Sequence, residues 1–306
     1  MSCKIIVMAA AAAFLAAPGA AAPAVPAAQP AQAQVVEIPF APPVGRTLRY
    51  RLGREATRDG RPQRSEATFA IVFRRSGPDY VMSVRTEMPA GVPPPSGESA
   101  IGQLLRRPME FRVTSDGEIA EMLDMDAIWE ATQRVLEQEV GRGPLAPGGR
   151  EGIERFIRQM RALPPEAQLE LFSRNVAPIV AVAGGVFAVG EEMSGNIEAQ
   201  SVVGSLDQQA SLRLDGADAL LARLSMRSSV SNEEAEAGMR SLFAGVAPAG
   251  GLMPSFRILS NETLETYEVS RETGLTVRHR VARTIVVEVG GVREQGVQVQ
   301  TLELVR

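Results

Sequence analysis

The sequence predicts an α+β fold: a long, curved antiparallel β-sheet built of hairpins, packed against a central group of about three α-helices. Two observations lead to this prediction. Apolar and polar residues alternate over residues 46–123 and 191–306, and turn residues separate the alternating segments. Between them, residues 126–183 carry apolar residues at spacings of three and four, which is typical of amphipathic helices.

The first 33 residues resemble a secretory signal peptide. Lys4 precedes the apolar core IIVMAAAAAFLAA, and Ala31 and Ala33 mark a small-residue cleavage site. Because this core is too short to span a bilayer, we expect a signal that is cleaved and a protein of the periplasm, or a secreted one. Residues 34–45 are then expected as an N-terminal tether, followed by a single α+β domain over residues 46–306.

Cys3 and Lys4 are the only cysteine and lysine, so the mature chain would have neither residue type. Removing Lys4 leaves 31 Arg against 36 Asp and Glu, a net charge of 31 − 36 = −5. The two signs are interleaved and no basic stripe indicates nucleic acid. Without lysine the usual phosphate-loop motif is absent, and no other motif predicts a cofactor. The longest later apolar run, residues 179–189, is too short for a transmembrane segment.

The first strands begin with TLRYRL, which is expected to turn at Asp59-Gly60. Two further strands are expected on either side of residues 76–79, followed by a Pro/Gly/Ser loop at 89–99. MEFRV then pairs with the strand beyond Asp116-Gly117, because Asp-Gly between alternating segments is a strong hairpin signal.

Three helices are expected in the centre of the chain. One covers residues 126–140, with Asp124 or Asp126 at its N-cap. The second covers residues 150–163. The third begins at residue 166, and Pro178 is expected to kink or end this third helix. The strand pattern then returns with turns at residues 215–216 and 272–274, and VQVQTLELV forms the last strand. Two half-sheets without helices, meeting at an interface, are the structural alternative.

Asp124 and Asp126 are candidate metal ligands, because two carboxylates close in sequence could chelate a cation. The segment DGEIAEMLDMDA does not have the ligand register of a helical calcium loop, however. Turn and cap roles explain Asp116, Asp124 and Asp126 without a metal. We therefore predict no metal site.

His279 is the only histidine and the candidate catalytic residue. It lies between Arg278 and Arg280 on an expected strand, in line with valines. Any Ser-His-Asp arrangement would have to use it. Because a single histidine is weak support for such a site, we expect a structural or surface role for His279 and predict no catalytic residue.

The chain resembles uncharacterised exported bacterial envelope proteins rich in β-hairpins. PPVGRTLRYRL near the start, PIVAVAGGVFAVGEEM in the middle and YEVSRETGLTVRH near the end carry this resemblance. Glu191 and Glu192 follow Gly190 where some of those proteins have a tryptophan-containing segment. More distantly, the chain is similar to periplasmic lipoprotein carriers, in which a curved sheet folds over helices around an apolar pocket. Neither resemblance supplies catalytic residues.

Export, hairpins, amphipathic helices and 12 methionines favour a non-catalytic periplasmic protein that binds an apolar or lipid-like molecule. The methionines could equally fill the core. One alternative is an envelope scaffold or protein-interaction module, whose partner is another envelope protein. The other is a hydrolase that uses carboxylates and His279.

Overall fold

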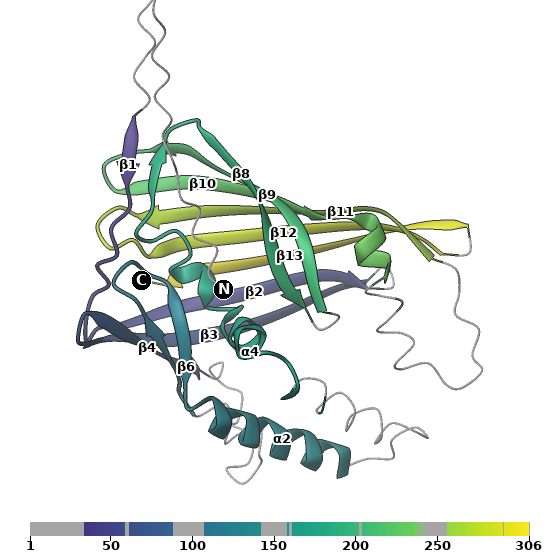
Figure 1. The fold of residues 1–306 in the computed structure, drawn as a ribbon, viewed down its shortest axis with the longest axis horizontal. Coiled ribbons are helices and arrows are strands. Elements are labelled where there is room, and N and C mark those ends of the chain that lie inside the picture. Colours follow the sequence, from purple (N-terminus) through teal and green to yellow (C-terminus); the bar gives the residue numbers. More distant parts are fainter. Residues whose placement is uncertain are drawn as a thin grey trace, which may run out of the picture.

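The computed structural model describes residues 34–58, 61–87, 107–141, 158, 161–201, 204–237, 240, 256–289 and 291–305 (Figure 1). The first strands are β1 (Val35–Glu37), β2 (Thr47–Arg58), β3 (Arg61–Ser76), β4 (Asp79–Glu87), β5 (Met109–Val113) and β6 (Ile119–Leu123). The helices with complete bounds are α2 (Met125–Gly141), α4 (Pro165–Ser173) and the short 3-10 helix η1 (Ala177–Ile179), and the described residues 158, 161, 232–237 and 240 are also helical. The remaining strands are β7 (Val186–Ala188), β8 (Glu192–Ser201), β9 (Gly204–Ala217), β10 (Leu221–Val230), β11 (Phe256–Ser270), β12 (Thr276–Val289) and β13 (Val292–Val305).

Eleven of the described strands form one antiparallel sheet in the order β6-β5-β4-β3-β2-β13-β12-β11-β10-β9-β8. The last strand, β13, pairs with β2, which joins the N-terminal and C-terminal hairpins into one sheet. The expected long antiparallel sheet is therefore confirmed, and the alternative of two separate half-sheets is wrong.

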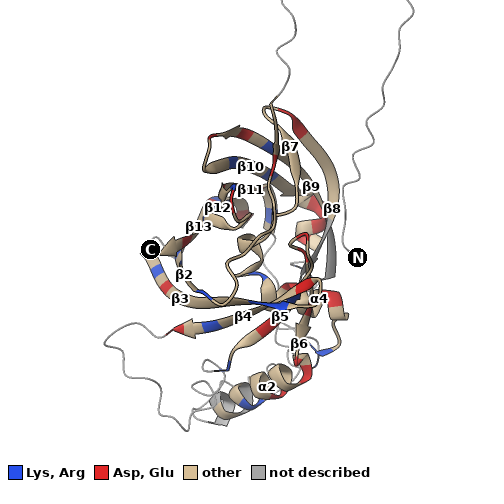
Figure 2. Cartoon of the chain, turned by 90° about the vertical axis from the view of Figure 1, so that its left-hand side faces the viewer, with Lys and Arg blue, Asp and Glu red and all other residues tan. Residues whose placement is uncertain are grey.

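The sheet is strongly curved, so that its strands follow an arc when viewed along their length (Figure 2). One face lies toward the α4–η1 segment: Thr276 on β12 donates to the Pro178 carbonyl in η1 at 2.7 Å, and α4 contacts β8 at the sheet edge. We call the face that carries Tyr50, Leu302 and His279 the inner face and the opposite face the outer face. Because successive side chains along a strand point to opposite faces, every second residue of a strand lies on the same face, except where the register shifts.

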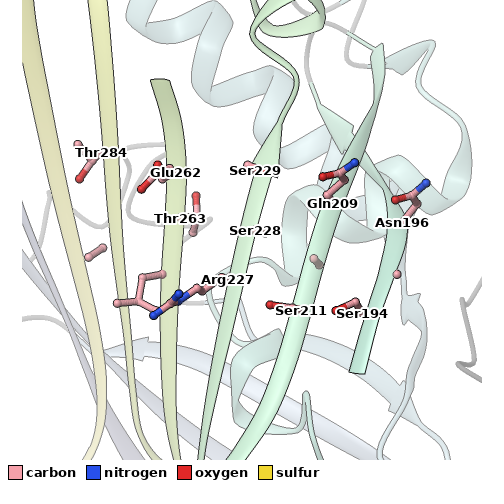
Figure 3. Close-up of a pocket in the computed structure, with 14 residues that line it drawn as sticks. Ser194, Asn196, Gln209, Ser211, Arg227, Ser228, Ser229, Glu262, Thr263 and Thr284 are labelled. Atoms are coloured by element: carbon pink, nitrogen blue, oxygen red, sulfur yellow. The ribbon is translucent and has the colours of Figure 1, made fainter. Parts of the chain in front are cut away.

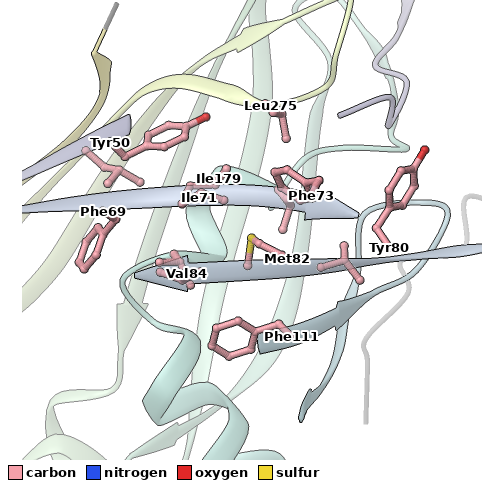
Figure 4. Close-up of a cluster of buried hydrophobic side chains, with 14 of the residues drawn as sticks. Tyr50, Phe69, Ile71, Phe73, Tyr80, Met82, Val84, Phe111, Ile179 and Leu275 are labelled. Atoms are coloured by element: carbon pink, nitrogen blue, oxygen red, sulfur yellow. The ribbon is translucent and has the colours of Figure 1, made fainter. Parts of the chain in front are cut away.

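The main hydrophobic core fills the space between the inner face of β2–β6 and η1 (Figure 4). Phe73, Phe111 and Ile179 are fully buried in it. A second cluster lies where β1 and β7 pack against β9–β11. The alternation read from the sequence thus gives each of these strands an apolar face that is buried.

The helical part is smaller than the expected central group of about three helices. Helix α2 agrees with the prediction for residues 126–140, but α4 has nine residues and ends before Arg174. Between α4 and β7 the only helical segment is the three-residue η1. It contains Pro178, which has no amide hydrogen to continue a helix. The helix expected at residues 150–163 lies largely outside the described residues.

Residues 34–45, expected as a tether, are packed into the fold. β1 pairs with β7, and Val36, Ile38 and Phe40 are buried. The Ala41 amide donates to the Thr273 carbonyl at 3.0 Å, which fixes this segment against the β11–β12 turn. The buried residues of this segment alternate with more exposed ones, and they are held by contacts with residues far along the chain.

Three expected turns are found where the sequence placed them. β3 and β4 are joined through Gly77 and β5 and β6 through Gly117, with φ angles of 63° and 88°. β11 and β12 are joined through Gly274, with a φ of 71°. Arg58 pairs with Arg61, although Asp59-Gly60 between them and the loop 89–99 lie outside the described residues.

The turn expected at Asp215-Gly216 is wrong by a few residues. β9 continues to Ala217, and the register shifts at this point so that Asp215 is an extra residue opposite β10. The turn is made by Asp218, whose carboxylate accepts the amides of Leu220 and Leu221, both at 2.9 Å. Asp-Gly suits a β-bulge as well as a turn, and here the longer pairing of the strands decides between them.

Candidate functional site

His279 lies on the inner face of β12 in a cluster with Glu265 and Tyr267 of β11, which we call the His279 cluster. Tyr267 is the cross-strand neighbour of His279, and their rings stack at 4.4 Å with an interplanar angle of 29°. The Nε2 atom of His279 lies 2.9 Å from Oε2 of Glu265, and the Tyr267 hydroxyl donates to the same oxygen at 2.7 Å. His279 is 1% exposed, so the cluster is built into the sheet.

The charges of this cluster are set by burial and by its hydrogen bonds. Burial acts to raise the pKa of the Glu265 carboxyl, but the hydrogen bonds from His279 and Tyr267 and the charges of His279 and Arg283 outweigh it and lower the pKa. Burial and the neighbouring Glu265 carboxylate raise the pKa of Tyr267 well above its ordinary value. The resting cluster therefore holds an ionised Glu265 and a protonated tyrosine that donates to it.

The His279 cluster has only some of the parts that a nucleophilic hydrolase needs. A base oriented by a carboxylate is present, but no serine or threonine hydroxyl among the described residues bonds to His279. The Nδ1 atom of His279 is buried and also has no hydrogen-bond partner among the described residues. The expectation that His279 is not catalytic stays a prediction, and the arrangement supports a structural role.

Asp124 and Asp126 lie at the start of α2 and contribute nothing to the His279 cluster. Asp124 occupies the N-cap position with a φ of 57°, and its carbonyl accepts the Ile128 amide at 3.1 Å. Its exposed carboxylate pairs with Arg107 at 3.7 Å, and Asp126 lies in the first helical turn. Within the described ranges no three His, Cys, Asp or Glu side chains gather as a metal site would require. The expectation that Asp124 and Asp126 bind no metal stays a prediction.

A second polar group on the same side of the sheet consists of Arg54, Arg174 and Arg283, which we call the inner arginines. Arg54 on β2 donates through Nε to Gln300 at 3.2 Å and through Nη2 to Asn175 at 2.5 Å. Arg174 precedes Asn175 in the chain, and Arg283 on β12 pairs with Gln298 of the strand between. In the part of the chain that the structure describes, none of the three guanidinium groups is paired with a carboxylate.

The three inner arginines act on one another electrostatically. Burial lowers the pKa of Arg54, and the positive charges of Arg174 and Arg283 lower it further. Arg54 is half-buried, whereas the other two are exposed. Three positive charges are thus brought together around Arg54 on the inner face.

One row of side chains across the inner face runs from charged to apolar. Strand pairing places Arg54, Gln300, Val281 and Glu265 in succession, from β2 to β11. The same row continues over β10, β9 and β8 with Met226, Leu212 and Met193. These last three residues are half-buried, and Met193 and Leu212 pack against the second hydrophobic cluster.

The outer face carries an open hollow of about 1020 Å³ over β8–β12 (Figure 3). Its lining is rich in hydroxyls and amides, such as Ser211, Gln209 and Asn196, together with Arg227 and Glu262. Among the described residues no aromatic side chain lines it, which disfavours a carbohydrate platform. Its polar lining and open shape suit a polar partner better than an apolar small molecule.

Sequence reasoning placed His279 but missed its partners and the inner arginines. Counting outward from the turn at Thr273 pairs residue 267 with residue 279 and puts residue 265 on the same face. The His279 cluster could therefore have been predicted from the hairpin register. No such signal existed for Arg54, because its approach to Asn175 joins residues 121 positions apart.

No family model and no curated protein matches this chain. Among the described residues, the helices are all too short or too polar to cross a membrane.

Proposed function

We propose that this is a non-catalytic protein of the periplasm that binds an apolar, lipid-like molecule on the inner face of its curved sheet. The observation that carries the proposal is the half-buried apolar row of Met193, Leu212 and Met226. These side chains lie on the concave side of the sheet, next to polar groups that would mark the end of an apolar ligand.

The chemistry of this row suits a ligand of variable shape. Methionine is unbranched and polarizable, so two methionines flanking a leucine can adapt to an alkyl chain. Burying the exposed parts of these side chains would contribute about 25 cal/mol for each Å² removed from water. The proposal therefore predicts binding that depends on chain length and on Leu212, the central residue of the row.

The test uses the protein recovered from the periplasm of an expressing bacterium. Native mass spectrometry should show excess mass that organic extraction removes, and the purified protein should then bind an apolar fluorescent probe. Leu212→Gln should weaken probe binding by about tenfold, because it places an amide in the apolar row. Leu264→Gln, which changes an exposed leucine of the outer hollow, is the matched control and should leave binding unchanged.

A clean apo mass together with no probe binding would exclude the ligand hypothesis. Equal binding by the wild type and Leu212→Gln would show that the apolar row is not the site.

A second candidate is an envelope interaction module, favoured by the polar hollow of the outer face and by the position of β8 as an edge strand of the described sheet. It predicts a protein partner that crosslinks to β8–β12 and is lost on Arg227→Glu, with no effect of Leu212→Gln. Crosslinks that map elsewhere on the chain would remove this candidate.

A further inference from the structure

The inner arginines bring three positive charges to one place, and within the described residues none of the three forms an ion pair with a carboxylate. Outer-face arginines are commonly paired, as Arg51 is with Glu303 at 3.2 Å. Two described carboxylates lie near the inner arginines: Glu265, which is affected by the charge of Arg283 and already accepts from His279 and Tyr267, and Glu170, one helical turn before Arg174.

Strand geometry allows the three side chains to converge. Arg54 and Arg283 are on strands separated only by β13, and their rows are adjacent. Their backbones are therefore separated by about 10 Å across the strands and about 7 Å along them, within reach of two arginine side chains that face the same space. Arg174 approaches from the α4–η1 segment, next to the Asn175 side chain that accepts from Arg54.

The neutral partners of Arg54 hold it in place without cancelling its charge. Gln300 and Asn175 each accept one of its hydrogen bonds, which leaves other N–H groups of the guanidinium for a further acceptor. Holding a half-buried arginine against two like charges is unfavourable unless an anion is also bound. Three arginines around neutral hydrogen-bond partners are the arrangement expected of a site that binds a negatively charged ligand.

We propose that Arg54, Arg174 and Arg283 bind the anionic headgroup, a carboxylate or a phosphate, of an amphipathic ligand whose alkyl chain lies along Met226, Leu212 and Met193. This assignment rests on the proposed function for the chain and adds the charge and orientation of the ligand. Guanidinium groups match both oxyanions because they can donate two parallel hydrogen bonds. An amine headgroup would be repelled.

The experiment compares ligands of equal chain length and different headgroup. Dodecanoate, dodecyl phosphate, dodecanol and dodecylamine are titrated below their aggregation concentrations against the periplasmically expressed, extracted protein, and binding is followed by calorimetry. The two anionic ligands should bind about tenfold or more tightly than dodecanol, and dodecylamine more weakly still. Sodium acetate and inorganic phosphate are titrated alone to test whether the anion is recognised without a chain.

Arg283→Gln is the first variant, because the Arg283 side chain is exposed and forms no ion pair or hydrogen bond with another described side chain beyond its electrostatic effect on Arg54 and Glu265, so replacing it should disturb the fold little. It should weaken dodecanoate and dodecyl phosphate about tenfold and leave dodecanol unchanged. Arg54→Gln should do the same with a larger loss. Arg280→Gln is the matched control, because Arg280 lies on the same strand but lines a hollow of the outer face.

Four outcomes separate the two proposals. Tight binding of the anions that is lost in Arg283→Gln but kept in Arg280→Gln supports the headgroup site. Equal binding of all the dodecyl ligands, unaffected by Arg283→Gln, overturns the headgroup site and leaves the lipid-binding function standing. Binding of acetate or phosphate alone with the same arginine dependence supports an anion site whose ligand is a free anion. No binding of any dodecyl ligand or free anion overturns both proposals.

Discussion

Replacing Glu265 by glutamine tests whether the His279 cluster stabilises the fold as the structure indicates. The side chain is 16% exposed, and its Oε2 atom accepts from both His279 and Tyr267. Glutamine has nearly the same shape but no charge, and only its oxygen can accept. Charge-assisted hydrogen bonds are about twice as strong as neutral ones, and each contributes about 1.5–3 kcal/mol. Losing the charged part of two such bonds should lower the free energy of unfolding by about 2 kcal/mol at pH 7.

The pH dependence of this loss follows from the lowered pKa of Glu265. Because the carboxyl is more acidic in the folded protein than its ordinary value of 4.5, folding favours its ionised form. The stabilisation is therefore fully present above pH 4.5 and is lost as the pH falls through the folded-state pKa. The difference between the wild type and Glu265→Gln should be greatest near neutral pH and shrink steadily below pH 4.5.

Urea unfolding of both proteins, followed by circular dichroism between pH 7 and pH 3, measures this difference directly. Glu262→Gln is the matched control, because Glu262 lies on the same strand but is exposed at the outer hollow. Its free energy of unfolding should stay within about 0.5 kcal/mol of the wild type at every pH. A difference for Glu265→Gln that is no larger than the control, or that does not change with pH, would refute the assigned role of the cluster.

Two further predictions concern close contacts that hold the fold. Gly274→Ala should lower the free energy of unfolding by about 3 kcal/mol or more, since the residue has a φ of +71° and its new Cβ would overlap the Pro39 carbonyl. Gly77→Ala, with a φ of +63° and open space around it, should cost only about 1–2 kcal/mol, and equal losses in thermal melts would exclude the close approach as the cause. Tyr50→Phe removes a buried hydroxyl that donates to the Thr276 carbonyl at 2.9 Å, so urea unfolding should show a loss of about 1–3 kcal/mol. Tyr80→Phe should be nearly neutral, because the Tyr80 hydroxyl makes no hydrogen bond within the described residues, and a loss as large as that of Tyr50→Phe would contradict this assignment.

The sequence predicts the sheet well because its signals are local. Alternation assigns each strand a buried face, and turn glycines such as Gly77 and Gly274 mark where hairpins reverse. The hairpin pattern fails only where two local structures use the same residues, as at Asp215-Gly216, which forms a bulge instead of the turn. The helical pattern overestimates the third helix because apolar spacing continues past Pro178 although helical hydrogen bonding does not.

The inner arginines mark what the sequence alone does not reveal. Arg51 and Arg54 are three positions apart on β2, yet parity puts the first on the outer face with Glu303 and the second on the inner face with Gln300. Composition and net charge do not separate them, because they count both arginines alike. Only the pairing of β2 with β13, nearly 250 residues later, and the return of the α4–η1 segment to Arg54 show which arginine lacks an anion. The grouping of the inner arginines is therefore determined by pairing between residues far apart in the sequence. The most direct test of their role compares substitutions on the inner and outer faces of the same strand.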